Sequence, residues 1–443
     1  MGILIIVGQL ILSLSILIVL HEMGHFLPAK WFGTRVEKFF LFFDPWFELF
    51  SIERGGTRYG IGWLPLGGYV KISGMVDESF DTEALAEEPK EWEFRSKPAW
   101  QRLIIMLGGV TVNFFLGFLI FAMTLFTWGD EYLPTMNAKY GVAVDSVGTD
   151  LGLQDGDFVL GTETMEFERV SSALLRQELI INDAREIRIN RNGAELTLPV
   201  TDEQAKALSK EATKGYRIYR ERVPFVIAEM NEDSPAKKAG LEVDDKIIAL
   251  NSQPTPYFMD FVRAIKGKKN EEITVTIERG DQQQVVKVTT NDDAKIAASP
   301  YGGDRYFDYA TVEYGFLESF PAGVDRGWDF LTNQVRAFGQ IGKGKLDASD
   351  SLGSFISIGK LFGTTWDWQR FWELTAMLSL LLAFINMLPV PGLDGGHVMF
   401  LLYEVITGRK PSDVFVERAT LVGFILLVIL MVYAIGLDIS RLF

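Results

Sequence analysis

The fold is decided by residues 3–25, which read ILIIVGQLILSLSILIVLHEMGH. Residues 3–20 carry no charged side chain and are long enough to cross the hydrocarbon core of a bilayer as a helix. The run ends in His21-Glu22-Met23-Gly24-His25. Positions i and i+4 share one face of a helix, so both histidines can bind the same metal ion. Glu22 then stands beside an open coordination position, where it can take a proton from bound water.

The composition makes chance a poor explanation of this motif, because the chain has only three histidines in 443 residues. The alternative is two polar side chains that are satisfied at a helix end. There is no cysteine, so any metal ligands are nitrogen or oxygen donors and no disulfide forms. The net charge of -15 argues against a nucleic-acid partner.

Three further segments are apolar enough to span a bilayer, namely residues 103–127, 374–388 and 421–437. Trp366, Trp368 and Trp372 precede the third of these like an interfacial belt. The first apolar run could instead be a signal peptide, but it starts without a positive charge and no A-x-A-like site follows it. We therefore expect a polytopic α-helical membrane protein with four transmembrane helices.

Basic residues set the expected orientation. The extreme N-terminus carries none, whereas the connection between the first two spans carries Lys30, Arg35, Lys38, Arg54, Arg58, Lys71, Lys90, Arg95, Lys97 and Arg102. The short loop between the last two spans carries Arg409 and Lys410. The positive-inside rule then places the His21 end of the first helix on the cytoplasmic side. Both termini and residues 129–370 are expected outside.

Residues 36–75 combine an aromatic run with a Gly55-Gly56 turn, a pattern typical of β-hairpins. So much apolar surface would aggregate in water, so we expect these hairpins to enter the membrane beside the helices. Gly60 and Gly62 would let another backbone approach closely. An ordinary hairpin packed on a soluble core is the alternative.

The outer region contains an internal repeat, in which GLQDGDFV (residues 152–159) aligns with GLEVDDKI (residues 240–247) 88 residues later. Each copy follows a strand-like run and precedes a helical stretch (171–180 and 257–266) and alternating strands (186–199 and 272–289). Both copies resemble PDZ domains, the second more closely, so we expect two extracytoplasmic α+β PDZ-like domains. A PDZ groove binds a peptide as an added strand; spacer domains without a ligand are the alternative.

The second half of the site is predicted at residues 386–397, NMLPVPGLDGGH. Pro389 and Pro391 break a helix near membrane depth, which requires that the backbone be buried in protein or line a wet cavity. An intramembrane Asp394 needs a partner, and a metal ion on the two histidines provides one. Two imidazoles, a carboxylate and a water suit zinc, although Co, Mn and Fe(II) stay open. A helix N-cap is the alternative for Asp394, and we expect His397 outside the ligand set.

A transmembrane HExxH, a later N-x-x-P-x-P-x-L-D-G, four spans and tandem PDZ-like domains resemble the site-2 protease family over almost the whole chain. The resemblance implies that His21, His25 and Asp394 hold Zn2+ and that Glu22 is the catalytic acid and base. It implies a membrane-reentrant β-loop at residues 60–68 and substrate positioning by Asn386. One departure is Gly108-Gly109-Val110, where many members carry a proline that would kink the second helix.

The predicted activity is hydrolysis of a peptide bond inside the membrane. The resemblance implies that the substrates are single-pass proteins of the bacterial inner membrane whose outer part has already been trimmed, such as an anti-sigma factor or signal-peptide remnants. An edge strand at residues 60–63 would capture the unwound substrate. Substrate contacts are expected at Gly60, Ile61, Gly62, Trp63, Asn386, Pro389 and Pro391. The rival interpretations are a metal transporter that uses the same three ligands and a catalytically silent scaffold that displays PDZ domains.

The expected organisation has seven parts. Residues 371–443 contain the third and fourth spans with the LDG motif. Residues 293–370 form an outer linker whose amphipathic helix (Trp328, Leu331, Val335, Phe338) lies on the membrane or packs as an ordinary surface helix. The remaining parts are the first span (1–35), the β-hairpin region with a cytoplasmic loop (36–99), the second span (100–130) and the PDZ-like domains (131–222 and 223–292).

Overall fold

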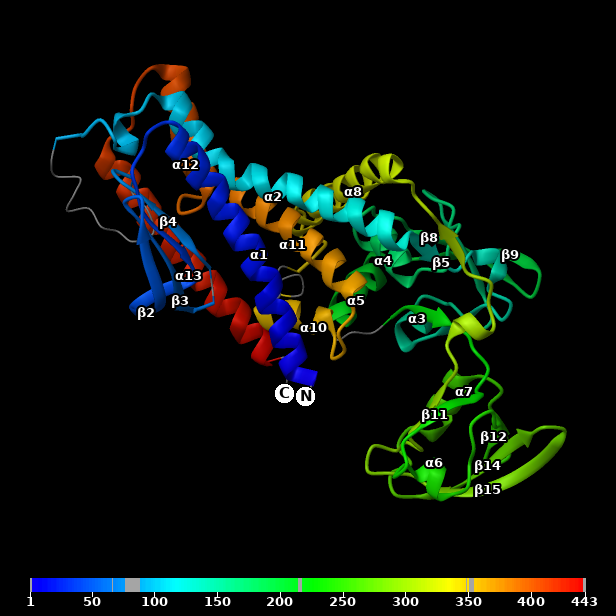
Figure 1. Cartoon of the computed structure of the whole chain (residues 1–443). Coiled ribbons are helices and arrows are strands. Elements are labelled where there is room, and N and C mark those ends of the chain that lie inside the picture. The colour runs from blue at the N-terminus through cyan, green and yellow to red at the C-terminus, as the bar shows by residue number, and fades with distance from the viewer. Residues whose placement is uncertain are drawn as a thin grey trace. The chain divides into compact units, whose positions relative to one another are not determined.

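The computed structural model describes residues 2–65, 67–75, 88–213, 217–347, 349 and 354–440. It consists of two compact units (Figure 1). The first comprises Met1–Gly129, Glu313–Val335 and Leu352–Phe443 and contains the predicted metal ligands. The second comprises Asp130–Val312 and Arg336–Ser351 and contains the sequence repeat.

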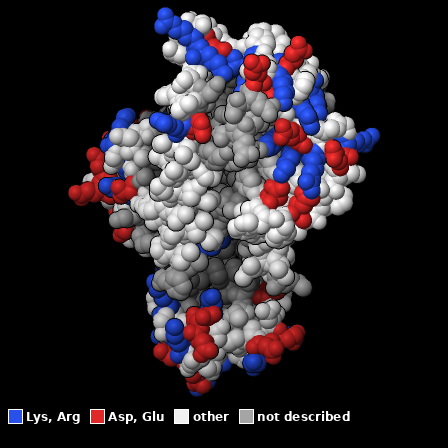
Figure 2. Space-filling view, turned by 90° about the vertical axis from the view of Figure 1, so that its left-hand side faces the viewer, with Lys and Arg blue, Asp and Glu red and all other residues white. Residues whose placement is uncertain are grey.

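Four helices of the first unit are long and apolar enough to cross a membrane, as the sequence predicted. They are α1 (Gly2–Trp31), α2 (Ala99–Trp128), α11 (Trp368–Met387) and α13 (Asp413–Ser440). The helix α1 extends past the end of the uncharged run at residue 20 and continues to Trp31, so the His21–His25 motif lies inside it. Figure 2 shows, on one face, a wide area without charged side chains beside a strongly charged one, as a bilayer-embedded surface requires.

Helix α2 is the centre of the first unit, because it packs against α1, α11 and the shorter α12 (Asp394–Thr407). Hydroxyl groups link these apolar helices. Ser13 Oγ lies 2.9 Å from Thr375 Oγ1, and Ser379 Oγ donates to the carbonyl of Asn113 at 2.7 Å. Interhelical hydrogen bonds of this kind stabilise helix packing where lipid removes the hydrophobic driving force.

The aromatic region forms a four-stranded sheet in the order β2-β3-β1-β4. Its strands are β1 (Val36–Leu41), β2 (Phe43–Arg54), β3 (Thr57–Leu64) and β4 (Tyr69–Ile72). The predicted Gly55-Gly56 turn joins β2 to β3, and both glycines have a positive φ, as a two-residue hairpin turn requires. Trp46, Phe47, Leu49 and Phe50 on β2 are exposed, whereas Phe40 on β1 is fully buried. The apolar side chains on β2 therefore need a covering that the described residues do not provide.

The predicted amphipathic helix is α8 (Phe316–Gly342), and its apolar residues have different surroundings. Leu331 is buried with Phe121 of α2 and Leu380 of α11, whereas Trp328 and Val335 are more than half exposed. The first part of this helix is thus packed on two candidate spans, which favours the alternative of an ordinary packed helix at Leu331. A second short helix, α10 (Phe355–Phe362), packs on α1 through Gly359.

In the second unit the repeat has a structural counterpart. The predicted helices are α4 (Ser172–Ile180) and α7 (Phe258–Ile265), and the predicted strands are the hairpins β8–β9 and β14–β15. Asp157 is buried and accepts two hydrogen bonds from Arg191, while Asp245, 88 residues later, accepts two from Arg279. The same pair of a buried aspartate and an arginine therefore occurs in each copy of the repeat.

The other elements of the second unit complete two buried cores, one for each copy. The first copy contains β6 (Val142–Val144), α3 (Ser146–Asp150), β7 (Phe158–Thr162), β8 (Glu186–Arg191), β9 (Ala194–Pro199), α5 (Asp202–Thr213) and β10 (Tyr219–Glu221). The second contains β11 (Ile227–Met230), α6 (Pro235–Lys238), β12 (Lys246–Leu250), β13 (Gln253–Pro254), β14 (Glu272–Arg279), β15 (Gln282–Thr289) and β16 (Ala298–Pro300). Outside both cores, β5 (Asp130–Tyr132) pairs with β17 (Ala310–Val312).

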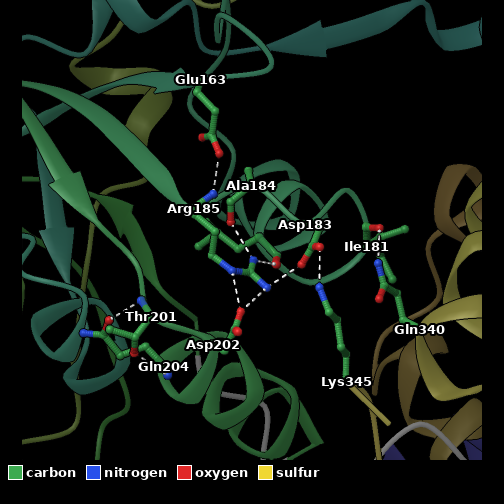
Figure 3. A network of polar contacts seen from close by, with 11 residues as sticks. Glu163, Ile181, Asp183, Ala184, Arg185, Thr201, Asp202, Gln204, Gln340 and Lys345 are labelled. Atoms are coloured by element: carbon green, nitrogen blue, oxygen red, sulfur yellow. Dashed lines mark hydrogen bonds and ion pairs between the residues drawn. The ribbon is translucent and has the colours of Figure 1, made fainter. Parts of the chain in front are cut away.

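Polar contacts tie further parts of this unit together. Arg263 of α7 forms an ion pair with Asp155 and donates to the carbonyl of Val144, so the second copy contacts the first. In Figure 3, Lys345 points toward Asp183, and Gln340 Nε2 donates to the carbonyl of Ile181 at 3.1 Å. The segment that follows Arg336 is therefore fixed to the first copy.

Candidate active site

Three predicted metal ligands converge in the first unit. His21 and His25 lie one turn apart on α1, and Asp394 is the first residue of α12. The Nε2 atoms of both histidines lie 3.3 Å from Asp394 Oδ2 and 3.3 Å from each other. Tetrahedral zinc with bonds of about 2.0–2.1 Å separates its ligand atoms by about 3.3–3.4 Å. The size of this triangle therefore fits zinc.

The Asp394 carboxylate also behaves as a cation ligand. Its Oδ2 atom is buried and makes no hydrogen bond to any residue that the structure describes. A buried oxygen without a donor is costly unless it faces a positive charge. Leu393, rather than Asp394, is the N-cap of α12, so the alternative of a capping aspartate is wrong.

Each imidazole is held through its other nitrogen. His25 Nδ1 lies 2.8 Å from the carbonyl of Ile105, and His21 Nδ1 lies 3.2 Å from the Asn113 amide, both on α2. The Oδ1 atom of Asn113 is buried without a partner among the described residues. Rotating this amide by half a turn lets Oδ1 accept the Nδ1 proton of His21. Both Nε2 atoms are then free for metal, as is usual for ligating histidines.

A close crossing of α1 and α2 brings these carbonyl and amide groups to the histidines. A Cβ at Gly108 would lie 1.9 Å from the Gly24 carbonyl oxygen, and one at Gly109 would lie 2.3 Å from His25 Nε2. Side chains at these positions would force the helices apart. No proline interrupts this crossing, and α2 runs without a break from Ala99 to Trp128.

Glu22 and Asn386 flank the three ligand atoms. Glu22 follows His21 on α1, and its carboxylate is close to the backbone of Val70 on β4. Asn386, on the last turn of α11, has its Nδ2 atom 3.3 Å from His21 Nε2. The side of the site that faces Asn386 therefore carries an amide group that can bind a carbonyl.

The segment between α11 and α12 contains both predicted prolines. α11 ends at Met387 and α12 begins at Asp394, so Pro389 and Pro391 lie in the break, where Gly392 has a φ of +96°. His397 lies one turn beyond Asp394, with its ring edge-on to Phe400, and is not part of the three-residue cluster. The expectation that it stays outside the ligand set agrees with this placement.

The expected edge strand at residues 60–63 is wrong. β3 pairs with β1 in parallel and with β2 in antiparallel register, so it is an inner strand. A Cβ at Gly60 would meet the ring of Phe40 at 2.4 Å, and one at Gly62 would meet the Phe43 carbonyl at 2.1 Å. These glycines allow close packing within the sheet. The edge strands are β2 and β4, and β4 contacts Glu22.

The predicted residues thus fall into two groups. The structure brings together His21, Glu22, His25, Asn386 and Asp394, and it places Ile61 and Trp63 in the sheet, where Trp63 Nε1 donates to the Pro45 carbonyl. The role of Asn113 was missed. The signal was a single amide side chain inside the apolar 103–127 run, since intramembrane polar groups tend to have a function.

Two histidines and an aspartate with a glutamate beside them, among helices apolar enough to cross a bilayer, define a membrane-associated zinc metalloprotease. The model of Peptidase family M50 matches residues 9–430, and the chain belongs to this family of site-2 proteases. It is 28% identical to the Regulator of sigma E protease of Haemophilus influenzae and to the Putative zinc metalloprotease of Vibrio cholerae, over 98% of each chain. It is 29% identical to Protease RseP of Yersinia pestis over the whole of both chains.

Proposed function

We propose that the chain cleaves peptide bonds within the transmembrane segments of single-pass membrane proteins. The observation that carries this proposal is the convergence of the three ligand atoms and Glu22 among helices that are apolar enough to span a bilayer. His21, His25 and Asp394 hold the zinc ion. When bound there, zinc acidifies a water molecule and polarises the scissile carbonyl.

Glu22 takes the proton of the attacking water and delivers it to the leaving nitrogen. Asn113 and the Ile105 carbonyl keep the imidazoles in the tautomer that presents Nε2. Asn386 donates its amide proton to a carbonyl of the substrate, because its Nδ2 atom already points to this side of the site. The side chains for proton transfer, for orienting the ligands and for binding the substrate thus all lie at the metal site.

A transmembrane helix conceals its carbonyls in backbone hydrogen bonds, so the substrate must be extended at the cleavage site. Among the described strands β4 pairs only with β1, so its other edge can pair with such an extended segment by β-addition. This edge is favoured because β4 contacts Glu22, whereas both edges of β3 are occupied.

The second unit is proposed to restrict access to substrates whose outer part has been trimmed. We assign its two repeated domains, at 131–222 and 223–292, as PDZ-like. Each contains an equivalent helix, an equivalent hairpin and an equivalent aspartate–arginine pair. The names of the relatives associate them with the sigma-E factor, and an anti-sigma factor is therefore one candidate substrate. We propose that the protein lies in the bacterial inner membrane with both termini and the PDZ-like domains on the outer side, because the basic residues gather in the opposite loops.

The test uses a purified, tagged single-pass substrate in full-length and outer-trimmed forms. Wild-type protein should cleave the trimmed form, and a zinc chelator should abolish cleavage. Glu22→Gln should bind zinc normally and lose cleavage, whereas Glu53→Gln, at the exposed end of β2, should behave as wild type. Residual cleavage by Glu22→Gln near the wild-type rate would refute the proposal. Metal transport into liposomes without any cleavage would favour the transporter, and intact signalling without the zinc ligands would favour the scaffold.

A further inference from the structure

A cavity of about 520 Å³ lies between the proline segment and α13. Pro389, Val390 and Pro391 form one wall, and Ala419 and Val422 are among the α13 residues that form the other. Its volume falls in the range of sites that bind small ligands or bulky side chains, about 300–1,000 Å³.

The cavity has a fixed inner wall. Gly423 is buried, and a Cβ at this position would lie 1.5 Å from the Pro391 carbonyl oxygen. The α13 backbone therefore rests directly on the proline segment, and no side chain separates them. Because protein interiors are close-packed, the cavity cannot widen at this wall unless α13 moves.

The proline segment also connects the cavity to the metal site. Asn386 precedes it, with Nδ2 3.3 Å from His21 Nε2, and Asp394 follows it, with Oδ2 3.3 Å from the same atom. Both ends of the segment therefore lie at the ligand triangle, and its middle lines the cavity. A peptide bound across the ligands runs next to this wall.

The chemistry of the walls selects an apolar occupant. The lining side chains are proline, valine, alanine, leucine and phenylalanine, and Arg418 is the single charged residue among them. The side chains of Val422 and Leu426 are more than half exposed, so a bound apolar group would cover their exposed surface. An aromatic side chain, which buries about 150–250 Å², suits such a site.

We propose that this cavity is a specificity subsite, which receives a bulky apolar side chain of the substrate's transmembrane segment next to the scissile bond. Val422, together with Ala419 and Leu426, then determines which side chain is accepted. The inference rests on the proposed function, since it needs a peptide at the metal site. A lipid acyl chain is the competing occupant, and the test below separates the two.

The test compares Val422→Trp with Leu421→Trp in the full chain. The two residues are neighbours in the middle of α13, but only Val422 lines the cavity. The substrates carry Phe or Ala at each position on either side of the cleavage site. Filling the cavity should lower the Phe-to-Ala ratio of kcat/KM by about tenfold or more, as expected for a filled apolar pocket. Leu421→Trp should leave the ratio within twofold of wild type.

The outcomes separate the subsite from the activity. Cleavage by both variants with an unchanged ratio, or with the same change in both, would overturn the subsite alone. Absence of zinc-dependent cleavage by the wild type would overturn both proposals. A photo-reactive residue at position 422 should crosslink to the substrate in inner-membrane vesicles; crosslinks to phospholipid alone would assign the cavity to a lipid and overturn the inference.

Discussion

Gly109→Ala adds one methyl group at the point where α2 touches the metal ligands. Its Cβ would lie 2.3 Å from His25 Nε2 and 2.7 Å from His21 Cε1. Ordinary carbon contacts begin at about 3.4–4 Å, so the overlap is about 1 Å. Both imidazoles would have to move, or α2 would have to separate from α1.

The size of the effect follows from these contacts. Overpacking of this kind costs about 1–3 kcal/mol. A 1 Å displacement of α2 also lengthens the hydrogen bonds from His25 to Ile105 and from His21 to Asn113. Loss of such supporting bonds typically lowers metal affinity by about 10–100-fold. We therefore expect zinc binding to weaken by at least tenfold while the helices stay folded.

The assay is a zinc titration of purified protein in detergent against a chelator of known affinity, with helix content followed by circular dichroism. Gly8→Ala is the first control, because no atom lies within 4 Å of the new Cβ. Gly117→Ala is the second, because it lies in the same helix as Gly109 and its Cβ would overlap the buried Leu380 side chain at 2.6 Å but touch no metal ligand. Wild-type zinc affinity in Gly109→Ala, or equal losses in all three variants, would refute the reasoning.

Three further predictions concern other contacts. Asn113→Leu should weaken zinc binding by about 10–100-fold in the same titration, because His21 loses its partner, and an unchanged affinity would contradict this role. Arg102→Met should destabilise the protein by about 3 kcal/mol in denaturant unfolding, since the partly buried Glu404 loses its ion pair with the buried Arg102, and a second change Glu404→Leu should restore most of the loss. Burial raises the pKa of Asp155, but hydrogen bonds from Arg263 and a backbone amide outweigh it, so the folded-state pKa lies below 3.8. Its stabilising contribution is present above the ordinary pKa and is lost as pH falls through the lower folded value; hydrogen exchange between the repeats should rise there, and Arg263→Gln should remove this acid dependence.

Much of the site could be predicted because its signals are local. The spacing of His21 and His25 fixes a shared helix face, and an aspartate after an apolar run demands a counter-charge. The four spans follow from uninterrupted apolar stretches. The repeat was visible because the same turn residues recur at a constant offset, and Asp157 and Asp245 occupy equivalent positions in the structure.

The errors concern properties that depend on distant partners. The sequence predicts a sheet edge at Gly60 and Gly62, because the pattern of a single hairpin does not show which further strand pairs with it. The parallel pairing of β1 with β3 encloses it, and that pairing joins strands separated by the whole of β2. Strand order is a long-range choice, since the same alternating pattern suits an inner and an outer strand.

The sequence by itself therefore determined which atoms can bind zinc and which segments can cross the membrane, because residue spacing and hydropathy act over one helix. Only the tertiary structure decided that β4 forms the edge at Glu22, that Asn113 and Ile105 orient the histidines, and that Gly423 seats α13 on the proline segment. These features arise where two elements distant in sequence come within van der Waals contact. Close packing, rather than local pattern, selects the partners.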